Sequence, residues 1–235
     1  MRGASKKQGK SNKPEAYETG NVPFLGADID LSLRPLIPRP ETEFWVERAI
    51  AGMKKHVRVL DLFAGSGCIG IAVAKAIPEA HVDFAEINPQ FTEQIKINLA
   101  KNGIEPERAR VYESDMFEQL ASETYDYILA NPPYVAPGEK IEASVRDWEP
   151  HEALFGGAGG LQYVKRTLTE APRHLAPGGK LYLEFSPRQK AALSHIVTRG
   201  ALTFYRDQYR RWRFAIWEAK DGTPPRRGKA SARTR

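Results

Sequence analysis

The feature that most constrains this fold is a regular alternation of short apolar runs and helical patterns that begins at Val57. Apolar runs typical of strands occupy residues 57–62, 81–86, 109–113, 125–130 and 180–185, and patterns with helical spacing occupy residues 68–77, 88–103, 161–175 and 188–200. Strands that are separated by helices are typical of a mostly parallel sheet, because each parallel connection needs about a dozen residues or more. The sequence therefore predicts an α/β fold.

The C-terminal end departs from this alternation. Two further strand patterns, at residues 202–207 and 211–219, are joined only by the short turn QYRR. A connection this short fits antiparallel neighbours. We therefore predict a seven-stranded, mostly parallel sheet that ends in an antiparallel C-terminal hairpin.

One domain is predicted over residues 17–219, and its first part is expected to form a flap over residues 17–43. Residues 21–37 have an extended pattern without helical spacing. The segment PLIPRPETE, residues 35–43, then leads into a helical pattern over residues 42–53. The flap is therefore expected to precede the sheet as a separate small element.

The two ends of the chain carry its basic charge. Residues 1–20 have a net charge of +3 and residues 220–235 a net charge of +5, so the remaining body is at −2 although the whole chain is at +6. Residues 1–16 and 220–235 contain almost no apolar side chains, and we predict that both are disordered tails. They are either solvated tails or segments weakly attracted to a polyanion such as the ribosome.

Several classes of protein do not fit this composition. No apolar run approaches the roughly 20 residues that a membrane span needs, and the first twenty residues lack the apolar stretch of a secretory signal. The single cysteine, Cys68, excludes an internal disulfide framework and fits a reducing compartment. The five histidines show no ligand spacing, so we predict no metal site. We expect a cytoplasmic monomer.

A glycine turn follows the first predicted strand in DLFAGSGCIG, residues 61–70. Gly65 and Gly67 permit a tight turn, so that a ligand can lie against bare backbone beside the free N–H groups of a helix N-terminus. Glu86 ends the second strand, 21 residues past Gly65, where a carboxylate can accept hydrogen bonds from ribose hydroxyls. Without Glu86, a structural glycine turn would be an equally good interpretation.

The third strand adds two residues to the same edge of the sheet. Asp115 follows it directly, and Met116 is placed to lie on the face of an adenine. No lysine of the phosphate-binding loop type is present in these motifs, so a nucleoside with a small charged group fits better than a nucleotide.

The fourth strand ends in ILANPPY, residues 128–134. The side-chain carbonyl of Asn131 and the main-chain carbonyl of Pro132 can each accept one N–H of a planar –NH2 group, while Tyr134 can stack on its flat face. Such an arrangement holds a weakly nucleophilic nitrogen in position and polarises it. Pro133 stiffens the same corner, because proline fixes its φ angle.

These motifs resemble one family. NPPY after the fourth strand and DLFAGSGCIG after the first are similar to class I (Rossmann-like) S-adenosylmethionine-dependent methyltransferases that act on planar nitrogens. PLIPRPETE and the segment VRDWEPHEALFGGAGGLQYVKRTLTEAPRHLAPGGKLYLEF resemble the release-factor glutamine-N5 methyltransferases of the HemK/PrmC family. The resemblance runs from about Tyr17 to Trp217.

The resemblance implies S-adenosyl-L-methionine as cofactor and a peptide chain release factor, with its Gly-Gly-Gln loop, as protein substrate. It implies a donor site made of Phe63, Ala64, Gly65, Ser66, Gly67, Glu86, Asp115, Met116 and Asn131. It implies that Asn131, Pro132, Pro133 and Tyr134 hold the glutamine amide, and that Arg39 and Glu41 lie near the substrate. Glu149 and the glycine run at residues 156–160 match a further family stretch, and from its residues alone we interpret the run as a flexible loop.

The sequence differs from the family at Phe63, where many relatives have a small residue, in EFSPRQ (residues 184–189) in place of a more usual glycine, and at its N-terminal end, and it leaves alternatives open. Family members usually carry an N-terminal helical domain that docks the release factor, and here only about 16 residues precede the resemblance. The same chemistry could act on another protein, such as a ribosomal one, or on the N6 amine of adenine in nucleic acid after base flipping. The acidic body disfavours a nucleic acid. A donor-binding scaffold without catalysis is the remaining alternative.

Overall fold

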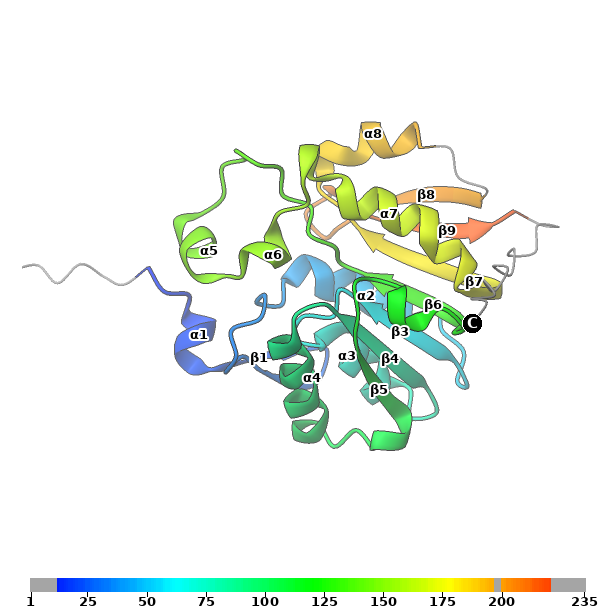
Figure 1. The fold of residues 1–235 in the computed structure, drawn as a ribbon, viewed down its shortest axis with the longest axis horizontal. Coiled ribbons are helices and arrows are strands. Elements are labelled where there is room, and N and C mark those ends of the chain that lie inside the picture. Colours follow the sequence, from blue (N-terminus) through cyan, green and yellow to red (C-terminus); the bar gives the residue numbers. More distant parts are fainter. Residues whose placement is uncertain (1–11, 197–199, 221–235) are drawn as a thin grey trace, which may run out of the picture.

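Seven strands form one sheet in the computed structural model, which describes residues 12–196 and 200–220 (Figure 1). Their order is β5-β4-β3-β6-β7-β9-β8. The strands are β3 (Arg58–Leu62), β4 (His81–Glu86), β5 (Ala109–Glu113), β6 (Tyr125–Ala130), β7 (Leu175–Glu184), β8 (Gly200–Arg206) and β9 (Trp212–Ala219). Strands β3 to β7 pair in parallel, whereas β9 is antiparallel to both β7 and β8. The predicted α/β fold with its antiparallel C-terminal hairpin is confirmed.

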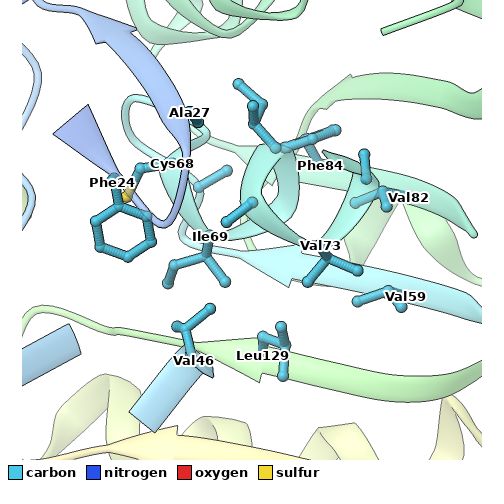
Figure 2. Close-up of a cluster of buried hydrophobic side chains, with 14 of the residues drawn as sticks. Phe24, Ala27, Val46, Val59, Cys68, Ile69, Val73, Val82, Phe84 and Leu129 are labelled. Atoms are coloured by element: carbon cyan, nitrogen blue, oxygen red, sulfur yellow. The ribbon is translucent and has the colours of Figure 1, made fainter. Parts of the chain in front are cut away.

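Helices cover both faces of this sheet (Figure 1). One face carries α2 (Pro40–Ala51), α3 (Cys68–Ala76) and α4 (Pro89–Lys101), and the other carries α7 (Gln162–Glu170) and α8 (Lys190–Ser194). Each face of the sheet forms a hydrophobic core with its helices, and successive strand residues point to opposite faces. Val59 packs with the first set of helices and Leu60 with the second. Figure 2 shows the first core around α3, where Ile69 and Val73 face the sheet.

The remaining elements are short. They are α1 (Glu15–Thr19), β1 (Asn21–Phe24), β2 (Ala27–Asp30), α5 (Ala143–Trp148), α6 (His151–Leu154) and the 3₁₀ turns at Pro106–Arg108, Glu118–Leu120, Ala158–Gly160, Ala171–Arg173 and Pro187–Gln189. Strands β1 and β2 form an antiparallel hairpin, which is the first part of the predicted flap. Helix α2 already begins at Pro40, a residue without an N–H that suits the first turn of a helix.

Three predicted boundaries near the C-terminal half were wrong. Strand β7 begins at Leu175, so the predicted turn APGG lies within the strand. Helix α7 ends at Glu170 rather than at 175, because Pro172 cannot donate the next helical hydrogen bond and the chain tightens into a 3₁₀ turn. Helix α8 ends at Ser194, and residues 197–199 of the predicted helix lie outside the described residues.

Residues 12–16, which were predicted as part of the N-terminal tail, have contacts with the body or belong to a helix. Helix α1 begins at Glu15, before the predicted domain boundary. Asn12 also contacts the body, since its side-chain amide donates to Asp147 Oδ2 at 3.0 Å and accepts from Trp148 Nε1 at 2.9 Å. Residues 1–11 and 221–235, the rest of the two predicted tails, lie outside the described residues.

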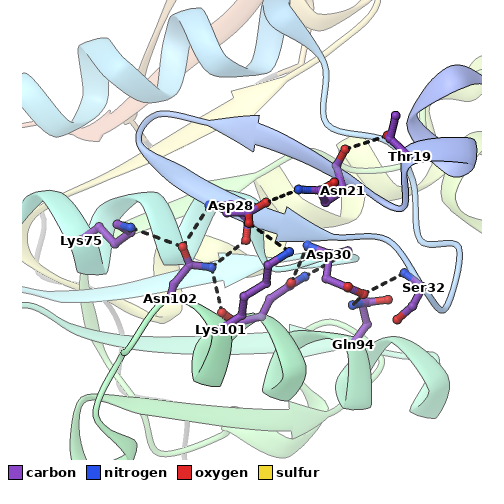
Figure 3. A network of polar contacts seen from close by, with 10 residues as sticks. Thr19, Asn21, Asp28, Asp30, Ser32, Lys75, Gln94, Lys101 and Asn102 are labelled. Atoms are coloured by element: carbon purple, nitrogen blue, oxygen red, sulfur yellow. Dashed lines mark hydrogen bonds and ion pairs between the residues drawn. The ribbon is translucent and has the colours of Figure 1, made fainter.

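Three amide side chains on α4 and its C-cap hold the β1–β2 hairpin against this helix, and Figure 3 labels two of them, Gln94 and Asn102. Gln94, Asn98 and Asn102 are spaced four residues apart and therefore share one face of the helix. Their side-chain oxygens accept from the backbone N–H groups of Leu33, Asp30 and Asp28, at 2.8, 2.7 and 3.0 Å respectively. The helix thus supplies partners to the backbone edge of the hairpin that a neighbouring strand would otherwise supply.

Asn98 also connects the hairpin to the glycine turn. Its amide nitrogen donates to the carbonyl of Asp30 at 3.0 Å and to the carbonyl of Ser66 at 2.9 Å. The side chain is fully buried. Because Ser66 lies between the two glycines of the turn after β3, one buried amide fixes the flap and this turn relative to each other.

A buried carboxyl on β3 holds the start of α3. Asp61 is fully buried, and its Oδ2 accepts from the backbone N–H of Gly70 at 2.8 Å. No donor among the described residues reaches its Oδ1. Burial raises the pKa of Asp61 from its ordinary 3.8 to about 8, against the opposing effect of the Gly70 hydrogen bond, and the nearby Glu86 carboxylate adds to the rise. This carboxyl therefore keeps its proton at neutral pH.

None of the helices in the described part of the chain is long and apolar enough to cross a membrane.

Asn98→Ala is expected to lower the free energy of unfolding by about 2–4 kcal/mol, because it leaves one N–H and two carbonyls without their partner in a buried place. Asn102→Ala is the matched control. Asn102 makes the corresponding pair of hydrogen bonds with the N–H and carbonyl of Asp28, as Asn98 does with Asp30. These two bonds are exposed, so water replaces them in the variant and a loss below about 1 kcal/mol is expected. Urea denaturation measures both, and equal losses would contradict the proposed role of Asn98.

Asp61 should make stability depend on pH. The folded state binds its proton more tightly than the unfolded chain does, so the contribution of Asp61 is full at low pH and is lost as the pH rises from about 4 to about 8. Asp61→Asn removes the titration, so the wild type should lose stability relative to this variant between about pH 5 and pH 8. Denaturation curves across this range provide the measurement.

The control for that experiment is Asp28→Asn. The Asp28 carboxyl is exposed, and its hydrogen bonds from Asn21 and Lys101 lower its pKa, so it is already ionised at about pH 5. Its replacement should leave the difference from wild type constant over the same range. Parallel pH curves for the wild type and Asp61→Asn would show that Asp61 ionises normally.

Candidate active site

One pocket lies where the parallel strands end. It opens at the carboxyl ends of β3, β4 and β6 and has about 1020 Å³ of unfilled space, part of it open to solvent. It is lined by residues 36–39, 63–66, 85–87 and 114–116 together with Thr42, Cys68, Ile69, Phe91, Asn131, Pro133, Glu152, Ala153 and Tyr163. The carboxyl ends of parallel strands are the usual place for a ligand site in such sheets.

Most of the residues predicted for the donor site border this pocket. Those that do are Phe63, Ala64, Gly65, Ser66, Glu86, Asp115, Met116 and Asn131. Gly67 does not border it. A Cβ atom at Gly67 would come within 3.2 Å of Ile95 and 3.3 Å of Ile71, so this glycine lets the turn pack on the helices behind it.

The turn after β3 holds three residues in the left-handed region of backbone space. Phe63 has φ +64°, Gly65 has φ +53° and Gly67 has φ +78°. This conformation costs about 1–2 kcal/mol for a residue with a side chain, so Phe63 is held in place by its surroundings. A Cβ atom at Gly65 would meet nothing within 4 Å, so the backbone is bare on the side where a ligand can approach.

Glu86 ties this turn to the end of β4. Its carboxylate is buried, with one oxygen accepting from the N–H of Gly65 at 2.8 Å and the other from the N–H of Asn88 at 2.9 Å. Burial raises the pKa of Glu86, and these backbone hydrogen bonds oppose the rise. Each oxygen keeps a second lone pair, so the carboxylate can still accept from a pair of hydroxyls in the pocket.

An aromatic pair forms one wall of the pocket. Phe63 and Tyr163 of α7 meet edge to face with 5.8 Å between ring centroids. Buried Met116 lies on the same side of the sheet, beside Asp115, whose carboxylate pairs with Arg166 at 2.6 Å. Sequence reasoning missed Tyr163, because a helical residue in the expected core pattern carries no sign that it faces a pocket.

The corner after β6 brings Asn131 to the opposite side of the pocket. Its amide nitrogen donates to the hydroxyl of Thr42 in a long hydrogen bond of 3.4 Å. Among the described residues, no hydrogen-bond donor reaches Asn131 Oδ1. Pro133 borders the pocket as well, whereas Pro132 and Tyr134 do not belong to its lining.

A second buried carboxylate anchors this corner. Glu184 ends β7 with no exposed surface and accepts three hydrogen bonds, from Thr42 Oγ1 at 2.7 Å, Trp45 Nε1 at 2.7 Å and the Tyr134 hydroxyl at 2.9 Å. The Tyr134 hydroxyl is therefore a structural anchor, a role that the predicted stacking did not include. Thr42 was likewise missed, although it lies in the PLIPRPETE motif that sequence reasoning singled out.

The glycine run at residues 156–160 supports the same corner, and its interpretation as a flexible loop was wrong. The N–H of Gly156 donates to the carbonyl of Val135 at 2.9 Å. A Cβ atom at Gly160 would lie 2.0 Å from the backbone oxygen of Tyr134, and Gly160 has φ +66°. Gln189 Nε2 bridges the carbonyls of Tyr134 and Gly160, at 3.1 and 2.8 Å. Only glycine permits this close contact with the corner.

Arg39 and Glu41 lie in different surroundings. Arg39 borders the pocket and pairs at 2.6 Å with buried Glu149, whose other oxygen accepts from the N–H of Ile37. Glu149 therefore holds the segment before α2 over the pocket. Glu41 does not border the pocket, and its nearest cation is Arg213 at 3.8 Å.

In the described residues, no group of three or more His, Cys, Asp and Glu side chains could hold a metal ion.

The fold has close counterparts among solved structures. The T. thermophilus 16S rRNA N2 G1207 methyltransferase, solved in complex with AdoMet and guanosine, is 20% identical in sequence and has a TM-score of 0.60. The likeness covers 85% of this chain and 50% of that one. At this identity it shows the fold alone, and it confirms the predicted class I methyltransferase architecture.

Sequence relatives are more specific. Residues 44–147 match the family described as the methyltransferase small domain. The release factor glutamine methyltransferase of Geobacter sulfurreducens is 36% identical over 189 residues, which are 80% of this chain and 66% of that protein. The protein of the same name from Cereibacter sphaeroides is 35% identical over 194 residues, which are 82% of this chain and 68% of that protein. The chain thus spans about two thirds of the length of these relatives, and it belongs to the release factor glutamine methyltransferase family.

Proposed function

We propose that this chain transfers a methyl group from S-adenosyl-L-methionine to the side-chain amide nitrogen (N5) of a glutamine in a protein. The substrate is the Gly-Gly-Gln loop of a peptide chain release factor, which gives the enzyme a role in translation termination. The observation that carries the proposal is the position of Asn131 Oδ1, an acceptor without a protein donor, on the wall of the pocket that also holds Glu86 and the glycine turn.

The donor half of the pocket fits a nucleoside with a small charged group. Gly65 offers backbone that no side chain covers, and the Glu86 carboxylate retains lone pairs for two ribose hydroxyls. Phe63, Met116 and Tyr163 supply apolar surface for a flat base. S-adenosyl-L-methionine would be held by these residues, and when bound it supplies a methyl group on a positively charged sulfur.

The acceptor half positions the nitrogen. Asn131 Oδ1, on the pocket wall, accepts one N–H of the glutamine amide, so the nitrogen is aimed at the methyl carbon. The Pro132 carbonyl, which follows Asn131 but does not belong to the pocket lining, is the proposed acceptor for the other N–H. Methyl transfer to this nitrogen would form a C–N bond as the donor's S–C bond breaks with its electron pair left on sulfur, and the nitrogen would pass one proton to water. The two acceptors stabilise the positive charge that develops on the nitrogen, without requiring a strong base.

Two other substrates share this chemistry. Another protein with an exposed glutamine, such as a ribosomal one, presents the same amide, and adenine presents a planar amine. The charge of −2 on the body between the basic ends disfavours a nucleic acid, because such a substrate would be bound largely through its phosphates. The names of the relatives favour the release factor over other proteins.

The proposal includes the cellular setting. The only cysteine, Cys68, is free and buried, which suits a reducing cytoplasm. We propose a monomer that works near the ribosome, with the basic terminal segments providing weak attraction to it. Most of both segments lie outside the described residues.

Glu86→Ala should weaken the binding of S-adenosyl-L-methionine by about 1–3 kcal/mol, the usual loss for hydrogen bonds to a charged group. Titration calorimetry measures this, with circular dichroism to confirm the fold. Glu152→Ala is the matched control, since it removes the same charge from the rim of the same pocket without touching the glycine turn. Unchanged affinity in Glu86→Ala would remove Glu86 from the donor site.

The substrate is tested by incubating the enzyme with labelled donor and a release factor, followed by mass spectrometry. We expect one methyl group on the glutamine of the Gly-Gly-Gln loop and none when that glutamine is alanine. The rate should change little with salt, because a protein loop docks by shape rather than through phosphates. Methylated adenine in nucleic acid, with the release factor unmodified, would contradict the proposal and leave the donor site unaffected.

A further inference from the structure

We propose that Glu184 and Thr42 are positioning residues that decide which way the amide of Asn131 faces. The buried carboxylate of Glu184 sets the direction of a short hydrogen-bond chain through Thr42, and this chain presents the oxygen of Asn131 to the acceptor nitrogen. The inference rests on the proposed function, because its consequence is the capture of a planar –NH2 group.

The hydrogen-bond chain starts from Glu184, which in its ionised form can only accept. Glu184 has no exposed surface, and its two oxygens receive the hydrogens of Thr42, Trp45 and Tyr134 at 2.7–2.9 Å. An ionised carboxylate has no proton to give, so each partner must be the donor. These partners come from α2 and from the corner after β6, and Glu184 therefore joins two segments far apart in the sequence.

Thr42 links Glu184 to Asn131, because its hydroxyl bonds to both side chains. A hydroxyl has one hydrogen, and in Thr42 that hydrogen is used in the 2.7 Å bond to Glu184 Oε2. Towards Asn131 the Thr42 oxygen therefore offers only a lone pair. The amide side that faces it, at 3.4 Å, must be the –NH2 group. Asn131 Oδ1 is then the side of the amide left for the pocket.

The opposite orientation would defeat capture of the substrate. With its –NH2 group towards the pocket, Asn131 would place a donor against the –NH2 group of a glutamine, and two donors cannot pair. An asparagine amide rotates easily between its two orientations unless a neighbour distinguishes oxygen from nitrogen. Thr42 makes this distinction because Glu184 has already fixed its hydrogen.

Three hydrogen-bond donors and one cation surround the Glu184 carboxyl. Burial raises the pKa of this carboxyl above its ordinary value, and the hydrogen bonds from Trp45 and Thr42 and the positive charge of Arg213 oppose part of that rise. Arg213 is itself held on β9 by Asp207, whose Oδ2 accepts from Nε at 3.0 Å. The antiparallel hairpin thus contributes a charge to the acceptor half of the site.

Thr42→Val tests the proposal with nearly constant side-chain shape. We expect kcat for release factor methylation to fall about tenfold or more, because the orientation of Asn131 is no longer fixed, while KM and the donor Kd change less than about twofold. Thr42→Ser keeps the hydroxyl and should stay within about threefold of wild type. Trp45→Phe removes a donor to the same Glu184 oxygen without touching Asn131. This variant should lower the Tm, but it should lower kcat clearly less than Thr42→Val does.

A double-mutant cycle makes the result decisive. In the Asn131→Ala background, adding Thr42→Val should cause less than about a twofold further loss, since the side chain that Thr42 orients is absent. If the two losses simply multiply, or if Trp45→Phe lowers kcat as much as Thr42→Val does, Thr42 acts through general stability and the proposal is overturned.

A second measurement needs no substrate. In protein labelled with ¹⁵N-asparagine, the Asn131 –NH2 signal is assigned by its loss in Asn131→Asp, and its hydrogen exchange with water is followed. Exchange should be faster in Thr42→Val than in the wild type and unchanged in Thr42→Ser. Equal exchange in all three would overturn the positioning role. A wild type that shows this exchange pattern but leaves the release factor unmodified would contradict the proposed function alone.

Discussion

Burial of carboxyl groups at the ends of strands is the constraint on which this site depends. Asp61 on β3, Glu86 on β4 and Glu184 on β7 are all buried at the same edge of the sheet. A buried carboxyl is costly unless donors reach it, so each one fixes the backbone or side chains that supply its hydrogen bonds. Asp61 fixes the start of α3, Glu86 fixes the glycine turn, and Glu184 fixes α2 and the corner after β6. The loops at this edge are therefore ordered by the strands beneath them.

The flap depends on a comparable constraint, that of unpaired backbone groups. Among the described residues the hairpin edge formed by β2 has no neighbouring strand, and side chains of α4 and its C-cap supply its partners instead. Gln94 also accepts from Leu33, at the point where the chain leaves the hairpin and continues to the residues that line the pocket. With Glu149 holding Ile37 at the other end of that segment, the cover of the pocket is fixed at both ends by hydrogen bonds to backbone N–H groups.

Sequence reasoning predicted the sheet and the donor half of the site because both depend on local patterns. The strand ends, the glycine turn and Glu86 follow from periodicity and spacing within about 30 residues, the span of one βαβ unit. Contacts between distant segments were not predictable in this way. Thr42 meets Asn131 across 89 positions, and Gly160 supports Tyr134 through a backbone contact that a glycine-rich sequence does not distinguish from a flexible loop. Helix ends were wrong where Pro172 and a short C-terminal helix ended the pattern early.

The two halves of the pocket are therefore built on different principles. The donor half consists mostly of backbone and one carboxylate from adjacent motifs, so it can be the same in enzymes that modify different substrates. The acceptor half is a set of side chains gathered from α2, the corner after β6, β7 and β9, and in the proposed function it binds a planar –NH2 group. Glutamine and adenine both offer this group, so in the proposed function the surface around the opening is what distinguishes them. The turn between β8 and β9 reaches the start of α2, where Gln208 Nε2 donates to the Pro40 carbonyl at 3.1 Å, next in sequence to Arg39 of the pocket lining. The C-terminal hairpin is thereby tied to the segment before α2 that lies over the pocket.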